Sequence, residues 1–261
     1  LAPLPLGGNR SLPAALLALT AGLLLIAWGL HTAVSGRRAP VAPARLRWPL
    51  LLYGAVCLWA FMQWLPTGWG DPVWAEASAA LGMPLAARIS VNPEATLSGL
   101  MRLLAYGGVF WLALQLTRDR ARARAAILAA AATGAVYSLY GIIVYLAGNG
   151  WILMYRKWAY GDSLTSTFVN RNSFATFAGL CLLCAFCMLL DRIRHLIALD
   201  RPWRIKTAMI AEELLGRSAA LAFSPLVIAI ALMLTASRAG IASSLLALAV
   251  FVTLWLRGRP L

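Results

Sequence analysis

The sequence predicts an all-α protein, a polytopic bundle of about seven transmembrane helices. Of its 261 residues, 61% are hydrophobic and only 12% are charged, and the mean hydropathy is +0.76. A soluble domain averages about 45–50% apolar and about 25% charged residues. The composition therefore excludes disordered, collagen-like and disulfide-rich secreted proteins, and also an ordinary cytosolic enzyme.

Seven apolar stretches carry this prediction. About 20 apolar residues are needed to cross roughly 30 Å of hydrocarbon, because the backbone must satisfy its own hydrogen bonds there. The stretches are residues 12–34, 49–65, 97–117, 125–147, 173–190, 218–236 and 239–256. Small residues inside them, such as Gly107, Gly108 and Gly134, predict close contacts between helices. Together the stretches predict a single membrane domain over residues 1–261.

Basic residues in alternate gaps between these stretches predict the orientation. Cytoplasmic loops carry an excess of Lys and Arg. The basic gaps contain Arg37, Arg38, Arg45 and Arg47; Arg118, Arg120, Arg122 and Arg124; Arg192, Arg194, Arg201, Arg204, Lys206 and Arg217; and Arg257 and Arg259. This places Leu1 outside, together with the loops 66–96 and 148–172 and the short connection 236–239. Membrane topology thus explains most of the net charge of +14, and no nucleic-acid partner is expected.

Seven of the 23 basic residues fall on the predicted outer side, where this rule does not explain them. They are Arg10, Arg88, Arg102, Arg156, Lys157, Arg171 and Arg238. Ionisable groups at the membrane surface are costly and are candidates for a function. The alternative is that they reach for phospholipid headgroups. Helix ends hold Arg102, Arg171 and Arg238 near the membrane, which favours a function for these three.

The polar segment 165–175 leads from an outer loop into the fifth apolar stretch. Asn172 or Ser173 is positioned to cap the helix, so that its free N–H groups and the positive end of its dipole point outward. Together with Arg171, this predicts an anion site at the membrane surface. The alternative is an ordinary capped helix start in which Arg171 only anchors the interface.

The segment 234–240 joins the last two apolar stretches. Ser237 is placed to cap the seventh helix, with Arg238 in the first turn. An arginine there opposes the helix dipole, which is easier to understand if an anion bridges Arg238 and the helix terminus. In the alternative reading, Arg238 merely reaches the headgroup layer.

These two segments resemble motifs of the O-antigen ligase and Wzy-type polymerase family. The run from Thr167 to Ala175 is similar to the family's G-T-F-x-N-x-N-x-F-A signature, with Ser166 in the place of its Gly. The run from Thr235 to Gly240 resembles its T-x-S-R-G segment, with Ala239 inserted before the Gly. Further likeness lies in the segments 3–10, 72–76 and 102–106.

The resemblance implies a metal-independent membrane glycosyltransferase of the GT-C type, with no cofactor. Such an enzyme lies in the bacterial inner membrane with its active face in the periplasm. It moves a glycan from undecaprenyl pyrophosphate to lipid A-core or to another glycan chain. The resemblance implies that four arginines bind the pyrophosphate of the donor. It also implies that two asparagines shape the loop or bind sugar hydroxyls. These residues are Arg171, Arg238, Arg102, Arg88, Asn170 and Asn172.

The sequence provides no general base. Family members carry a large periplasmic loop with a His that is thought to activate the acceptor, and no such loop follows here before Leu261. His31 and His195 are predicted near the inner side, so neither reaches the outer site. We therefore expect a partial chain of a longer enzyme. The alternative is a non-catalytic membrane subunit or a protein that binds or transports lipid-linked glycans, and a flippase ranks third.

Two other patterns are assigned to structure. The spacing of Cys181, Cys184 and Cys187 resembles that of metal ligands, but all three lie inside a predicted span, where small apolar packing is favoured. Aromatic residues of the loop 148–163 belong to an interfacial belt, with stacking on sugars as the alternative. They are Trp151, Tyr155, Trp158 and Tyr160.

Overall fold

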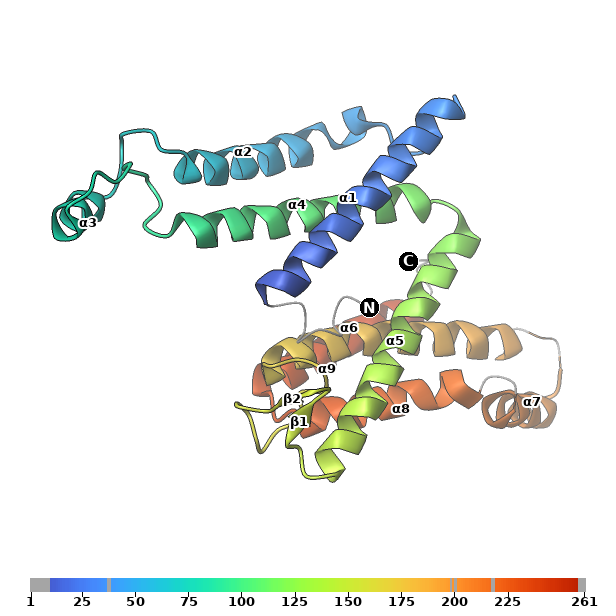
Figure 1. The fold of residues 1–261 in the computed structure, drawn as a ribbon. Helices are drawn as coiled ribbons and strands as arrows, with labels where there is room; N and C mark the ends of the chain where they lie inside the picture. Colours follow the sequence, from blue (N-terminus) through green and yellow to red (C-terminus); the bar gives the residue numbers. More distant parts are fainter. Residues whose placement is uncertain (1–9, 37–38, 198, 200, 217–218, 258–261) are drawn as a thin grey trace. The chain divides into compact units, whose positions relative to one another are not determined.

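The computed structural model is mostly helical and has only one short pair of strands among the described residues, which confirms the all-α prediction (Figure 1). It describes residues 10–36, 39–197, 199, 201–216 and 219–257. These form two compact units, one with α1 to α4 and the other with α5 to α9. Most of the motif-like opening segment 3–10 lies outside the described residues, as do Arg37, Arg38, Arg217 and Arg259.

Five helices of the described residues are long and apolar enough to cross a membrane, so the chain has the character of a membrane protein. They are α1 (Ser11–Val34), α4 (Pro93–Leu116), α5 (Arg120–Leu146), α6 (Arg171–Ile197) and α9 (Arg238–Leu256). The two other predicted stretches are also helical. In α2 (Arg47–Trp64), Arg47, Gln63 and the tryptophans lower the mean hydropathy, and α8 (Ala219–Leu234) has 16 residues. Seven spans therefore remain a prediction.

In the first unit, α4 packs against both α1 and α2 (Figure 1). Glycines on α4 allow the close approach: a Cβ on Gly108 would lie 2.7 Å from Leu25 Cδ1, and a Cβ on Gly107 would meet the ring of Tyr53. The Tyr53 hydroxyl donates a hydrogen bond of 2.8 Å to the carbonyl of Leu103. The helix contacts that the sequence predicted at these two glycines are confirmed.

Connections in the first unit are tied to α4 by polar side chains. Gln115, which is buried, accepts a hydrogen bond of 3.0 Å from the N–H of Val41 and donates one of 2.9 Å to its carbonyl. The short helices η2 (Pro43–Leu46) and α3 (Val73–Leu81) lie in the two connections. At its other end, α4 is capped by Asn92, whose Oδ1 accepts the N–H of Ala95 at 3.0 Å.

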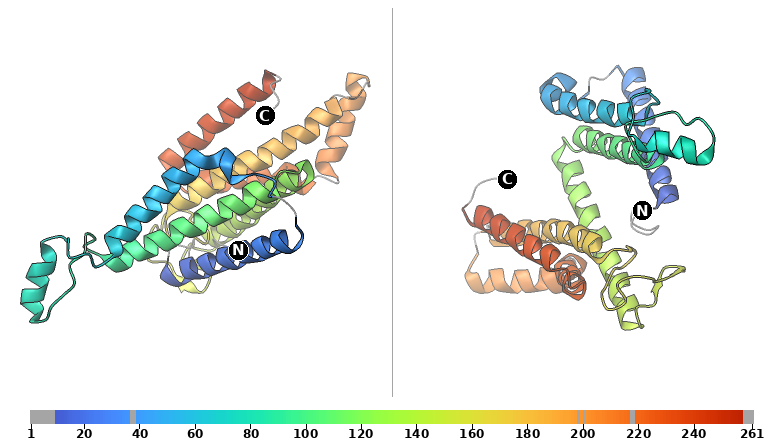
Figure 2. Two further views of the ribbon diagram at one scale, coloured as in Figure 1. Left: turned by 90° about the horizontal axis from the view of Figure 1, so that it is seen from above. Right: turned by 90° about the vertical axis from the view of Figure 1, so that its left-hand side faces the viewer.

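In the second unit, α6 is central and contacts α5, α8 and α9 (Figures 1 and 2). Alanines and one phenylalanine of α6, including Phe174 and Ala178, are fully buried against Ile228 and Ala231 of α8. A hairpin of β1 (Trp151–Ile152) and β2 (Tyr155–Arg156) follows α5, and α7 (Trp203–Leu215) follows α6.

Small residues also set the spacing of this second unit. A Cβ on Gly134 of α5 would collide with Cys181 of α6, and one on Gly179 of α6 would collide with the side chain of Ser244 on α9. Further along the contact between α5 and α6, Arg124 of α5 forms an ion pair of 2.9 Å with Asp191 of α6. Both partners are almost half exposed, so the ion pair adds little stability. Close packing at the glycines brings these helices together.

Substitution of Gly134 by Ala should destabilise the unit by about 1–3 kcal/mol, because the added methyl group forces α5 and α6 apart. Thermal unfolding in detergent measures the change. Gly29→Ala is the control, since a Cβ at Gly29 meets nothing within 4 Å and should leave the melting temperature unchanged or slightly higher. Equal melting temperatures for the two variants would contradict this packing.

Candidate functional site

Helix α6 begins at Arg171, two or three residues before the expected start. The expected cap at Asn172 or Ser173 is wrong, because Asn170 already supplies the acceptors. Its Oδ1 accepts the N–H of Asn172 at 2.8 Å, and its carbonyl accepts the N–H of Phe174 at 3.1 Å. Arg171 is therefore the first helical residue, directly beside the free N–H groups of the first turn.

Helix α9 begins at Arg238, and the predicted cap at Ser237 is confirmed. The Ser237 Oγ accepts the N–H of Gly240 at 3.3 Å. Ala236, just before the cap, has φ 52°, the left-handed region that turns the chain sharply from α8 into α9. The sharp turn between α8 and α9 therefore places Arg238 in the first turn of α9, as the sequence predicts.

The fold brings these two helix starts together. The Ser237 hydroxyl donates a hydrogen bond of 2.8 Å to Asn172 Oδ1, although the two residues are 65 positions apart. One turn further in, a Cβ on Gly240 would lie 2.6 Å from Ala175 Cβ, so only glycine allows this approach. Neither first turn contains an acidic residue. Two positive helix ends, each with an arginine, therefore face the same region.

Arg171 is half-buried and has a fixed orientation. Its Nη1 donates a hydrogen bond of 3.1 Å to Ser163 Oγ, and its guanidinium carbon lies 5.5 Å from the centre of the Tyr160 ring. Its Nε is buried and forms no hydrogen bond with the residues that the structure describes. Tyr160 thus supports Arg171, and its stacking on sugars stays a prediction.

The other predicted site residues differ in their surroundings. Arg238 is exposed and forms no hydrogen bond or ion pair within the described part of the chain. The side-chain oxygens of Asn170 and Asn172 are engaged in the bonds given above, which fits the loop-shaping alternative.

Arg88 and Arg102 belong to the first unit. Arg88 Nη1 donates a hydrogen bond of 2.9 Å to the backbone carbonyl of Trp64. The guanidinium carbon of Arg88 lies 5.7 Å from the centre of the Trp64 ring. Arg102 is partly buried in α4. Their contact with pyrophosphate stays a prediction.

Lys157 lies close to Arg171, a position that the motifs did not reveal. Its Nζ donates hydrogen bonds of 2.8 Å to Asn149 Oδ1 and 2.7 Å to the carbonyl of Ser163, the same serine that binds Arg171. Burial lowers the pKa of Lys157 to about 8, although the charge of Asp162 raises it in part. In the sequence, Lys157 was recognisable only as one of the seven outer cations that the positive-inside rule does not explain. It is also one of two lysines in the chain.

Strained backbone is concentrated around this site. All non-glycine residues of the described chain with a positive φ lie in the segments that lead into α6 and α9. They are Asn149, Leu153, Tyr160, Ser166 and Ala236. Such conformations cost roughly 1–3 kcal/mol each and cluster at functional sites, so the strain is consistent with a binding role.

Ser166 stands where the resembled motif has glycine, and its φ of 51° gives the reason for that glycine. The serine is accommodated because its hydroxyl donates a hydrogen bond of 2.7 Å to the carbonyl of Tyr137. Gly141 makes room for it, since a Cβ there would lie 3.0 Å from Ser166 Cβ. The motif conformation is therefore compatible with this substitution.

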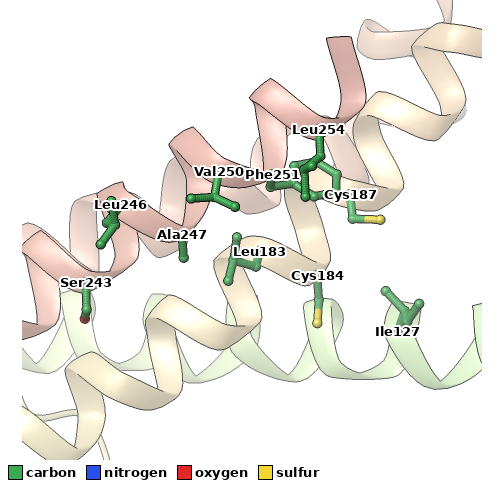
Figure 3. Close-up of a pocket in the computed structure, with 10 residues that line it drawn as sticks. All are labelled: Ile127, Leu183, Cys184, Cys187, Ser243, Leu246, Ala247, Val250, Phe251 and Leu254. Atoms are coloured by element: carbon green, nitrogen blue, oxygen red, sulfur yellow. The ribbon is translucent and has the colours of Figure 1, made fainter. Parts of the chain in front are cut away.

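An apolar groove of about 620 Å³ lies between α5, α6 and α9 (Figure 3). It follows α9 from Ser243 to Leu254, and Cys184 and Cys187 of α6 line it. In the described residues, no group of three or more His, Cys, Asp or Glu could hold a metal ion. The groove offers a hydrocarbon surface that begins about one and a half turns below Arg238.

No family model, curated protein or solved structure matches this chain. The functional argument therefore depends on the site residues and their geometry.

A double-mutant cycle tests the bond between the two helix starts. Ser237→Ala removes both the cap and the bond to Asn172, so it should cost about 1–3 kcal/mol, whereas Asn172→Ala removes only the bond. The coupling energy from unfolding in mixed micelles should be about 0.5–1.5 kcal/mol. Strictly additive effects would contradict the hydrogen bond.

Lys157 should titrate near pH 8 in the free protein, because its ammonium group is partly desolvated. Reductive ¹³C-methylation followed by NMR detects this, since the chain contains only Lys157 and Lys206. The signal lost in Lys157→Arg identifies Lys157. A midpoint at or above the ordinary lysine value of about 10.4 would contradict the burial.

Proposed function

We propose that this chain transfers a glycan from undecaprenyl pyrophosphate, at the periplasmic face of the bacterial inner membrane, to lipid A-core or a growing polysaccharide. The bond between Ser237 and Asn172 carries the proposal, because it unites the two segments that resemble ligase and polymerase motifs. It also brings the helix starts with Arg171 and Arg238 to one region.

The charges of this region suit a pyrophosphate. Two helix N-termini and two arginines concentrate positive charge, and no acidic residue occupies either first turn. An arginine in a first turn opposes the helix dipole unless an anion lies between them. A bound pyrophosphate satisfies both the N–H groups and the guanidinium groups.

The same charges act on the transfer step. The acceptor hydroxyl oxygen forms a bond to the anomeric carbon while the bond from that carbon to the pyrophosphate oxygen breaks. The electron pair leaves with undecaprenyl pyrophosphate, and the hydroxyl proton passes to a base or to water. Negative charge grows on the pyrophosphate as it leaves, and Arg171 and Arg238 are placed to stabilise it.

Other features support a lipid-linked donor. The apolar helices indicate a membrane protein, and the groove between α5, α6 and α9 provides an apolar surface suited to the undecaprenyl chain. The positive-inside pattern assigns the starts of α6 and α9 to the periplasmic side, where such donors present their glycan.

Arg171→Ala and Arg238→Ala should each lower glycan transfer by about 10²–10³-fold, the usual cost of removing one donor to a developing charge. The assay reconstitutes the full-length protein in vesicles with an undecaprenyl-pyrophosphate-linked glycan and lipid A-core. Transfer is followed as a mass shift of the acceptor on a gel.

Arg156→Ala is the matched control, because Arg156 is an exposed cation of the same outer loop with no side-chain bond in the described structure. It should transfer normally, and all three variants should insert into membranes as the parent does. Undiminished transfer by both Arg171→Ala and Arg238→Ala would contradict the site. Donor binding without transfer by the parent protein would instead favour a non-catalytic glycan-binding or transport protein.

A further inference from the structure

We propose that Lys157 is a third cation of the anion site and contacts the same phosphate group as Arg171. This inference rests on the proposed function and adds a residue that neither motif contains. It assigns the outer loop 148–170 a direct part in holding the lipid-linked pyrophosphate.

Ser163 holds the two cations close together. Its carbonyl accepts from Lys157 Nζ at 2.7 Å, and its hydroxyl accepts from Arg171 Nη1 at 3.1 Å. Ser163 is itself buried, with 4% of its surface exposed. The ammonium and the guanidinium are therefore both fixed within hydrogen-bond distance of a single residue.

These cations have no ion-pair partner within the described residues. Neither Lys157 nor Arg171 forms an ion pair there, and Asp162, the acidic residue that acts on Lys157, is exposed. Partial burial disfavours the charged form of Lys157, and Asp162 offsets this only in part. An anion bound beside both cations would stabilise their charged forms, which favours the pair as a binding site.

Both side chains retain donors for such an anion. An ammonium has three N–H groups, and those of Lys157 reach two protein acceptors, Asn149 Oδ1 and the Ser163 carbonyl. Arg171 uses one Nη1 bond, and the other N–H groups of its two terminal nitrogens form no hydrogen bond with the described residues. A phosphate group presents oxygens that accept from both.

The test is the binding of geranylgeranyl pyrophosphate, measured by calorimetry on the whole 261-residue chain in detergent. Lys157→Gln keeps a side-chain N–H donor and removes the charge. Its dissociation constant should rise by about tenfold or more, while its melting temperature without ligand stays equal or increases. A purely structural lysine would give the reverse pattern, a lower melting temperature with unchanged affinity.

Two variants serve as controls. Arg156→Gln makes the same charge change one residue away at an exposed side chain, so its affinity should change by less than about threefold. Lys157→Arg keeps the charge and should retain most of the affinity. If Lys157→Gln binds as the parent does, or if Lys157→Arg is as weak as Lys157→Gln, the proposal is wrong.

Arg171→Gln separates this inference from the proposed function. If Arg171→Gln loses affinity and Lys157→Gln does not, only the role of Lys157 fails. If both bind normally, the anion site fails, and the proposed function fails with it. Geranylgeraniol, which lacks the pyrophosphate, should bind equally to all variants; if its affinity falls in the same way, Lys157 acts on the hydrocarbon chain or on the fold, and the inference is overturned.

Discussion

The candidate site depends on the hydroxyl of Ser237, which makes two hydrogen bonds at once. It accepts the N–H of Gly240, which caps α9, and it donates to Asn172 on the first turn of α6. Two positive helix ends with arginines repel each other, so their approach needs a specific attraction. The bond and the close contact of Gly240 with Ala175 provide it. They hold the two helix starts of the candidate site together.

The loop before α6 is held by the same kind of local compensation. Left-handed residues at Asn149, Tyr160 and Ser166 are unfavourable for side chains with a Cβ. Hydrogen bonds from Asn149 to the Ser163 carbonyl and from Ser166 to the Tyr137 carbonyl offset part of this cost. The Leu164 N–H also donates to the carbonyl of Leu234 at 3.0 Å, which ties the loop to the end of α8. The strain therefore persists because several elements restrain the loop at once.

The sequence predicted the features that depend on local pattern. Apolar length gave the helices, and Ser237 was identifiable as a cap because serine before a helical run accepts a first-turn N–H. The start of α6 was placed too late, because Asn170, Asn172 and Ser173 are all suitable caps and only tertiary packing selects among them. The contacts of Lys157 could not be predicted, for a different reason. Its partners lie eight and six residues away in an irregular loop, where no periodicity relates them.

The double hydrogen bond between Gln115 and Val41 has a consequence for biosynthesis. Val41 lies in the connection between α1 and α2, and its partner follows 74 residues later in the chain. Until α4 has been made, the N–H and carbonyl of Val41 lack these acceptor and donor groups. At a synthesis rate of about 5–20 residues per second, this interval lasts roughly 4–15 s. The α1–α2 connection therefore gains these two hydrogen bonds only after Gln115 of α4 has been synthesised.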